Sequence, residues 1–188
     1  MLTCARICLL ALLLGASLRA TAGQPLMFIT EAYPPYNFSD DNILRGIAVD
    51  LLVIASLNTE QPVQRGQIRL MPWARAYETA RNTPGVLIYS IGRTPERDKY
   101  FKWVGVIAPT VYYLYGQPGR AYRVDSLEAA KTYQIGTVNE DVGEQFLVGQ
   151  GFVKGHNLQS SVKYEHNYEK LRAGRIDLWI MSELTANH

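Results

Sequence analysis

Cysteine is nearly missing from this sequence. Of its 188 residues only two are cysteines, Cys4 and Cys8, and both lie close to the N-terminus. From residue 23 onward there is none, which excludes a disulfide framework and a cysteine nucleophile for that part of the chain. An apolar core must therefore stabilise it without covalent cross-links.

Several sequence patterns that accompany catalysis are missing as well. The sequence has no Gly-x-Ser-x-Gly elbow, no glycine-rich phosphate loop and no histidines at the spacing of a metal site. Its histidines, His156, His166 and His188, are scattered. We therefore expect no cofactor, no bound metal and no catalytic residue, and we interpret the protein as a binding protein, not an enzyme.

A strong excess of charge of one sign is also lacking. The chain carries 19 lysines and arginines against 17 aspartates and glutamates. Arg6 and Arg19 account for the difference, so the residues from 23 onward are balanced. No basic stripe predicts nucleic acid as a partner, and no long apolar segment beyond the N-terminal region predicts a membrane span.

The first 22 residues have the layout of a secretory signal peptide. Arg6 supplies the positive n-region, residues 7–14 form an apolar core, and residues 20–22 have the small-x-small form of a cleavage site. A transmembrane anchor is the alternative, but the apolar run is shorter than the roughly 20 residues that a bilayer needs, and Arg19 interrupts its end. We predict cleavage after Ala22 and export to the periplasm without a lipid anchor.

Strand-like and helix-like patterns alternate after this signal. Apolar runs predict strands, and helical spacing predicts that Ile47, Leu51 and Ile54 share the core-facing side of one helix. The first series is expected as strand 26–30, helix 46–57, strand 68–70, helix 73–81 and strand 86–89, followed by extended segments at 101–104 and 111–115. The second is expected as helix 126–131, strand 133–138, helix 143–149, strand 161–164, helix 167–173 and strand 176–181. This alternation predicts an α/β fold with parallel strand pairs.

The two series predict two lobes. We place lobe 1 at 23–112, a hinge at 113–119, where glycine and proline indicate a linker, and part of lobe 2 at 120–188. In open α/β sheets, ligands bind beyond the carboxyl ends of the strands. The residues at these strand ends are therefore candidates for contact with a small-molecule solute: Glu31, Ser90, Thr137, Asn139, Ser182 and Glu183.

Two arginines, Arg93 and Arg97, follow the strand at 86–89. A guanidinium fork matches the two oxygens of a carboxylate, so either arginine could clamp one, and we favour Arg97. The alternative is a surface ion pair with a neighbouring acid such as Glu96 or Asp98.

Aromatic residues and acids complete the candidates. Tyr33 and Tyr36 lie in a proline-stiffened loop, where they either form a wall of a solute pocket or pack inward. Trp73 opens a helix and either stacks on a ligand or anchors that helix. Glu140 and Asp141 place negative charge at the start of another helix, which favours capping and disfavours a phosphate ligand.

Four stretches, in this order, resemble family 3 of the bacterial extracellular solute-binding proteins: Thr30-Glu31-Ala32-Tyr33-Pro34-Pro35-Tyr36, Gly46-Ile47-Ala48-Val49-Asp50-Leu51, Thr94-Pro95-Glu96-Arg97 and Leu171-Arg172-Ala173-Gly174-Arg175-Ile176-Asp177. The resemblance implies the two-lobed type 2 periplasmic-binding-protein fold and a monomer that closes on a carboxylate-bearing, amino-acid-like solute. It implies delivery of that solute to the inner-membrane permease of an ABC transporter. It also implies that Arg97 grips the ligand carboxylate, that Tyr33 or Tyr36 stacks on the ligand, and that Trp73 and Ser90 contact it.

The chain departs from this family in two places. Members that bind amino acids usually carry an aspartate after the last strand found here, where this chain has Ser182 followed by Glu183. The family also returns from the second lobe to the first through several dozen further residues, whereas this sequence ends at His188. The resemblance therefore implies a partial second lobe; if nothing follows His188, we expect a poorly covered first lobe and weak or no solute binding.

Two other functions fit the same resemblance. The fold serves as the input module of membrane-bound kinases, which would make this chain a sensor. It also hosts periplasmic dehydratases of small carboxylic acids, which need an acid/base pair in the cleft. Glu31 and Glu183 are the candidates for that pair.

Overall fold

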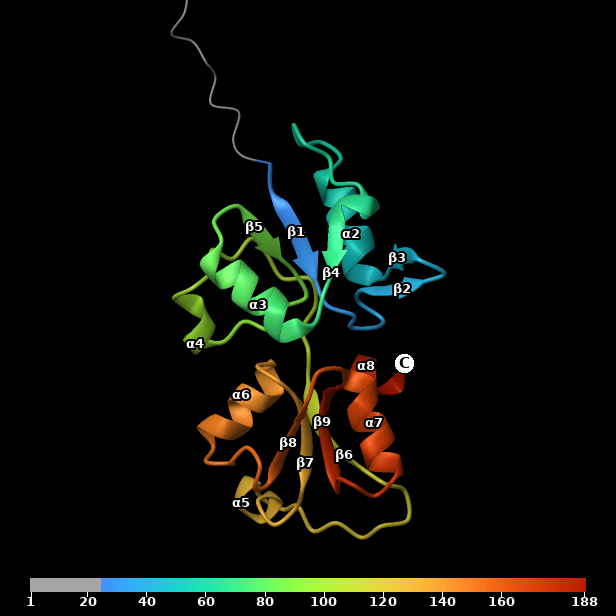
Figure 1. Ribbon diagram of the computed structural model, residues 1–188, viewed down its shortest axis with the longest axis vertical. Coiled ribbons are helices and arrows are strands. Elements are labelled where there is room, and N and C mark those ends of the chain that lie inside the picture. The colour runs from blue at the N-terminus through green and yellow to red at the C-terminus, as the bar shows by residue number, and fades with distance from the viewer. Residues whose placement is uncertain (1–24) are drawn as a thin grey trace, which may run out of the picture.

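Two groups of strands and helices, one above the other in Figure 1, make up residues 25–188, the part of the chain that this computed structural model describes. The predicted signal peptide at 1–22 lies outside the described residues. Among the described residues, no helix is long and apolar enough to cross a membrane.

The first group is built on a parallel sheet of the order β4-β1-β5. Its strands are β1 (Met27–Thr30), β4 (Ile68–Leu70) and β5 (Val86–Ile88). The helices α2 (Ile47–Ser56) and α3 (Trp73–Asn82) connect them. The sequence prediction of these five elements is confirmed to within about two residues at each end.

Four short elements of this group were not expected. A hairpin of β2 (Phe38–Asp40) and β3 (Ile43–Arg45) occupies a segment that we predicted as loop. Its turn residues Asp41 and Asn42 both have positive φ, at 48° and 62°, which suits the twist of a two-residue hairpin. The others are a 3-10 turn, η1 (Arg65–Gln67), and the helix α4 (Pro95–Asp98).

The second group is a four-stranded sheet of the order β6-β9-β7-β8. Its strands are β6 (Tyr112–Gly116), β7 (Ile135–Val138), β8 (Leu158–Ser161) and β9 (Leu178–Ser182), and only β6 runs antiparallel to its neighbour. Its helices are α5 (Leu127–Ala130), α6 (Val142–Gly149), α7 (Tyr164–Arg172) and α8 (Glu183–Asn187). The strand β8 and the helix α7 each begin three residues before their predicted positions.

The predicted hinge at 113–119 needs correction. Residues 113–116 lie within β6, which pairs along its whole length with β9 in the second sheet. The chain passes from the first sheet to the second between β5 and β6 (Figure 1). Residues 101–104, expected as an extended segment, lie in this connection and belong to no strand. Glycine and proline at 116–119 marked a real turn, but that turn follows β6 and does not connect the two sheets.

The predicted core face of α2 is also wrong. Val49 is fully buried, while Ile54 is 63 % exposed and Ile47 and Leu51 are exposed too. The start of the helix decides which face turns inward. Gly46 has a φ of 124°, and a Cβ there would lie 2.2 Å from the carbonyl oxygen of Tyr36, so the backbone approach admits only glycine.

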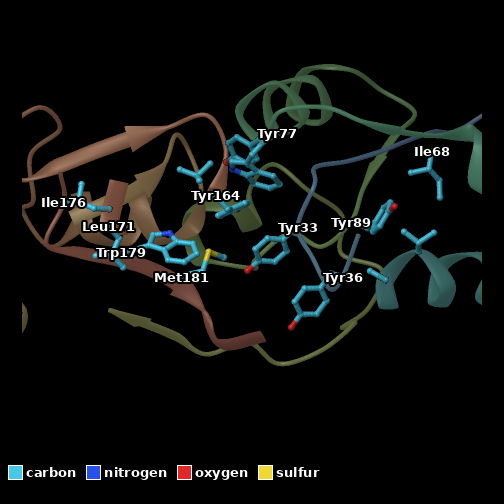
Figure 2. Close-up of a cluster of buried hydrophobic side chains, with 14 of the residues drawn as sticks. Tyr33, Tyr36, Ile68, Tyr77, Tyr89, Tyr164, Leu171, Ile176, Trp179 and Met181 are labelled. Atoms are coloured by element: carbon cyan, nitrogen blue, oxygen red, sulfur yellow. The ribbon is translucent and has the colours of Figure 1, made fainter. Parts of the chain in front are cut away.

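One apolar cluster runs from the first group into the second. It joins Tyr33, Tyr36, Trp73 and Tyr77 to Tyr164, Trp179 and Met181, among others. Figure 2 shows Tyr33 and Tyr164 between the side chains of the second sheet, such as Trp179, and those of the first, such as Tyr89. A separate cluster around Ile135, Leu147 and Leu158 lies within the second group alone. The two groups therefore share a core at their boundary.

Candidate functional site

A small cavity lies at this boundary. Its volume is about 10 Å³, which is room for about one water molecule. Both groups line it, mostly from the carboxyl ends of parallel strands, where ligands of open α/β sheets bind. The lining residues are Glu31, Tyr33, Trp73, Ser90, Gly92, Arg97, Tyr112, Asp141, Val142 and Tyr164.

Arg97 reaches the cavity from the short helix α4. Thr94 caps that helix by accepting a hydrogen bond from the backbone N–H of Arg97, and Pro95 follows at the first helical position. The residue is only 1 % exposed. Its guanidinium stacks on two rings of α3, with its central carbon 5.2 Å from the centroid of Trp73 and 4.9 Å from that of Tyr77.

The hydrogen bonds of Arg97 connect the two groups. It donates to the carbonyl of Gly92 at 3.0 Å, to the carbonyl of Glu140 at 3.1 Å and to Oε1 of Gln145 at 3.0 Å. These acceptors are all uncharged, and within residues 25–188 the guanidinium forms no ion pair. Burial lowers the pKa of Arg97 from its usual value, because a charged group loses hydration there.

Arg93, the other candidate clamp, points away. Its side chain is 61 % exposed and forms an ion pair with Asp98 at 2.8 Å. The guanidinium also lies 5.4 Å from the ring centroid of Trp103. This matches the alternative of a surface ion pair, so the prediction that Arg93 contacts the ligand is corrected.

Glu31 is held by groups from both sides of the boundary. It follows β1, and its Oε1 accepts a hydrogen bond from the Tyr164 hydroxyl at 3.1 Å. Its backbone carbonyl accepts another from the side-chain amide of Asn37. Burial, reinforced by the nearby Asp141 carboxylate, raises the pKa of Glu31 well above its usual value.

Asp141 faces the same cavity from the second group. It caps α6, where its Oδ1 accepts the backbone N–H of Glu144 at 2.8 Å. Its Oδ2 lies 3.5 Å from the Tyr164 hydroxyl. Burial raises the pKa of this carboxyl to about 6, although the hydrogen bond from Glu144 and the charge of Arg97 oppose the change.

Tyrosine hydroxyls also join the two groups. The Tyr33 hydroxyl donates to Oγ of Ser182 at 2.6 Å and lies 3.2 Å from the Tyr112 hydroxyl. Burial raises the pKa of Tyr33 to about 12, so the phenol stays protonated at neutral pH. The Tyr33 ring stacks on that of Tyr36 with centroids 5.4 Å apart.

Trp73 and Ser90 both line the cavity, as predicted. The indole N–H of Trp73 donates to the Glu140 carbonyl at 2.7 Å, which adds another link between the groups. Ser90 has a positive φ of 57°, and its hydroxyl donates to the Asn37 side chain. Asn37 is fully buried, so it fixes the end of β5 and the backbone of Glu31 together.

Five of the eleven predicted ligand-binding residues line the cavity: Glu31, Tyr33, Trp73, Ser90 and Arg97. Their contact with a ligand remains a prediction. The structure places the other six elsewhere: Tyr36, Arg93, Thr137, Asn139, Ser182 and Glu183.

Local hydrogen bonds explain most of these six positions. The Thr137 hydroxyl donates to the buried Glu144 carboxylate at 2.6 Å, and Asn139 accepts from Lys154 at 3.2 Å. Glu183 begins α8 on the exposed surface. The strand β7 therefore turns Thr137 toward α6 and away from the boundary.

Tyr36 and Ser182 do not line the cavity, but both contact Tyr33, which does. Tyr36 is buried in the shared core beneath Tyr33, and Ser182 is the fully buried acceptor of the Tyr33 hydroxyl. Both hold Tyr33 in place. In this structure they position Tyr33, and their contact with a ligand stays a prediction.

Sequence reasoning missed five lining residues: Gly92, Tyr112, Asp141, Val142 and Tyr164. Asp141 was recognised only as a helix cap. Tyr164 was expected at the end of a strand, whereas it opens α7 three residues before the predicted start. Tyr112 was assigned to the end of lobe 1, whereas it begins β6 of the second sheet. Glu165, an acid in the first turn of α7, was the available signal that the helix begins at Tyr164.

The fold defined by these two sheets and the site between them is that of the periplasmic binding proteins. An ancestral arginine-binding protein bound to arginine is similar with a TM-score of 0.74 and 20 % identity, over 88 % of this chain and 73 % of that chain. The arginine-binding protein of T. maritima, in its holo form, is similar with a TM-score of 0.72 and 17 % identity, over 86 % and 70 %. A histidine kinase sensor domain described as similar to periplasmic binding proteins has a TM-score of 0.75 and 15 % identity, over 87 % and 70 %.

These structural similarities establish the predicted α/β periplasmic-binding-protein fold. No family model and no curated protein matches the sequence. Two of these neighbours are arginine-binding proteins and the third is a sensor domain, and at 15–20 % identity their similarity shows the fold alone. The ligand of this chain has to be argued from its own residues.

Proposed function

We propose that this protein is a periplasmic solute-binding protein of the family 3 type, which captures a small, polar, amino-acid-like solute between its two lobes. One observation carries the proposal. Arg97 is buried at the boundary of the lobes and has only uncharged hydrogen-bond acceptors. Those bonds use three of the five N–H groups of a guanidinium, which leaves two for the oxygens of a ligand carboxylate.

The solute enters by separation of the lobes. The cavity of about 10 Å³ is too small for an amino acid, so the bonds that cross the boundary have to open and reform around the ligand. The arginine-binding neighbours make amino acids the first solutes to test. Export to the periplasm, action as a monomer and delivery to an inner-membrane permease belong to the same proposal.

The test compares the two arginines of one loop. A thermal-shift screen with amino acids, dicarboxylates and polyamines identifies the stabilising solute, and calorimetry then measures its affinity for Arg97→Ala and Arg93→Ala. We expect Arg97→Ala to weaken binding at least about 100-fold, because a charge-assisted bidentate contact is lost. Arg93→Ala is the matched control and retains wild-type affinity, since that side chain is exposed.

Unchanged binding by Arg97→Ala contradicts the assignment of the clamp. Stabilisation by polyamines above all acids contradicts the need for a carboxylate. If no solute in the screen raises the melting temperature, the proposal of solute binding itself is wrong.

A sensory input module is the second candidate, and the similarity to a histidine kinase sensor domain favours it. Both candidates bind a solute in the same cavity, so the ligand screen serves both. We propose binding without turnover: of the two acids suggested for acid/base chemistry, Glu31 faces the cavity and Glu183 is exposed. Consumption of small carboxylic acids by the purified protein would contradict this.

A further inference from the structure

The cavity has more acids than bases. Among the described residues that line it, Glu31 and Asp141 are carboxylic acids and Arg97 is the basic residue. Both acids are buried, and they come from opposite lobes. Closing the lobes therefore brings two carboxylates toward one guanidinium, which leaves one negative charge without a counter-charge when both acids ionise.

A single hydroxyl lies between the two carboxylates. Tyr164 is 3.1 Å from Oε1 of Glu31 and 3.5 Å from Oδ2 of Asp141. A phenol has one proton to donate, so it serves one carboxylate at a time. While it donates to Glu31, Oδ2 of Asp141 has room for a second donor, either a proton or a group on the ligand, because the Glu144 N–H occupies only Oδ1.

Ser182, the last residue of β9, offers no negative charge to a cationic group of the ligand. Ser182 is neutral and accepts the hydrogen bond of Tyr33. The walls around the acids are the rings of Tyr33, Tyr112 and Tyr164, and aromatic rings favour a cation over an anion at their faces. The excess of carboxylates, the free acceptor positions and the aromatic lining all favour a cationic group of the ligand.

From this geometry, and resting on the proposed function, we propose that the cavity takes a solute with one more positive than negative charge, whose ammonium or guanidinium group binds between Glu31 and Asp141. The carboxylate of the same solute binds Arg97. Two acids, one guanidinium and such a ligand together are electrically neutral.

The assignment predicts that ligand binding depends on pH. Burial raises the pKa of both acids, that of Asp141 to about 6. The charged groups that act on the pair are Arg97, which favours ionisation, and Glu144 and Glu165, which oppose it. A cation binds the ionised carboxylates, so we expect its affinity to rise from pH 5 to pH 8 as Asp141 loses its proton.

The test uses pairs of ligands that differ by one charge. Calorimetry on the full chain compares L-lysine with L-norleucine and L-arginine with L-citrulline, and includes L-glutamate and cadaverine. We expect each cationic amino acid to bind at least about tenfold more tightly than its neutral counterpart, as the loss of a charged hydrogen-bonding group implies. Cadaverine, which lacks the carboxylate, binds more weakly than L-lysine because it does not use Arg97.

Two substitutions locate the cationic group. Asp141→Asn keeps the helix cap, since asparagine is an equally good capping residue. It is expected to weaken L-lysine binding about 10- to 100-fold and to reduce the preference over L-norleucine. Glu31→Gln acts in the same direction. The exposed residues Asp125 and Glu169 provide the matched controls Asp125→Asn and Glu169→Gln, which retain wild-type affinity.

The outcomes separate the two proposals. Equal affinity for cationic and neutral partners, or an unchanged preference in both variants, overturns the inference and leaves solute binding standing. Binding that does not strengthen from pH 5 to pH 8 also overturns it, and this measurement needs no variant. Absence of binding by every probe overturns solute binding and the inference together.

Discussion

At the residue scale, the buried acid at the start of α6 has two roles. Asp141 caps the helix through Glu144, and it faces the cavity beside Arg97 and Tyr164. Such a residue stabilises the local element, yet its burial makes ionisation costly. The cost shows as a raised pKa, and it makes the stability of the ligand-free protein depend on pH.

We predict that stability decreases as pH rises through the region in which Asp141 ionises. The folded state keeps its proton up to about pH 6, whereas the unfolded state loses it from the usual value of 3.8. Between these values the folded state binds more protons, so the free energy of unfolding falls with rising pH. From pH 4.5 to 7.5 the contribution of Asp141 is about 2 kcal/mol.

Urea unfolding of the wild type, Asp141→Asn and Asp125→Asn at both pH values measures this effect. The difference between wild type and Asp141→Asn isolates the carboxyl from all other titrating groups. Asp125→Asn should follow the wild type because that residue is exposed. Parallel pH profiles for the wild type and Asp141→Asn would show that the pKa is unperturbed.

At the element scale, α2 shows how a backbone contact overrides an amphipathic pattern. The helix has apolar residues on more than one side, and the approach of Gly46 to Tyr36 selects the side that turns inward. The backbone N–H of Ala48 donates to the carbonyl of Tyr36 at 2.9 Å, which fixes the first turn against the loop that carries Tyr33. The same contact therefore orients the helix and one wall of the cavity.

This orientation predicts opposite outcomes for two substitutions in one helix. Val49→Ala removes fully buried methyl groups and should lower the free energy of unfolding by about 1–3 kcal/mol. Ile54→Ala removes more atoms, but from a side chain that is 63 % exposed, and should change it by less than about 0.5 kcal/mol. Denaturant unfolding of both variants decides the matter; a larger loss for Ile54→Ala would mean that the sequence pattern, not the backbone contact, sets the buried face.

At the scale of the whole molecule, the two lobes are coupled by core as well as by hydrogen bonds. Tyr33 belongs to the shared cluster, stacks on Tyr36, lies 5.1 Å from the Tyr164 ring centroid and donates to Ser182. Glu31 and Tyr164 touch although they are 133 positions apart in the chain. A boundary of this kind favours unfolding of both lobes together.

We predict one cooperative transition for the chain, with tryptophan fluorescence and far-ultraviolet circular dichroism changing at the same denaturant concentration. Tyr33→Ala should lower the free energy of unfolding by about 3–5 kcal/mol, since a buried ring is removed from the shared cluster. Tyr33→Phe is the control that keeps the ring and loses only the hydroxyl. Two separate transitions in the wild type would mean that the lobes fold independently and that the first is poorly covered.

What the sequence by itself determined is local. Alternating periodicity predicted most strands and helices, and negative charge at Glu140 and Asp141 indicated a helix start, which α6 confirms with Asp141 as its N-cap. The sequence also predicted Arg97 as a candidate ligand-binding residue, because an arginine shortly after a strand end can be recognised from neighbouring residues alone. These features depend on contacts within a few positions of the chain, which the sequence displays directly.

What the tertiary structure decided is which distant residues meet. Arg97 lines the cavity, whereas Arg93 is exposed. The chain crosses between the sheets before β6, not within the predicted hinge. Asp141 and Tyr164 line the cavity together with Glu31. The sequence around Asp141 predicts a helix cap, but it does not show whether the same carboxylate lines a cavity, because that depends on residues distant in the chain. Packing across the lobes therefore assigned the charges of the site, and with them the kind of solute that we expect it to bind.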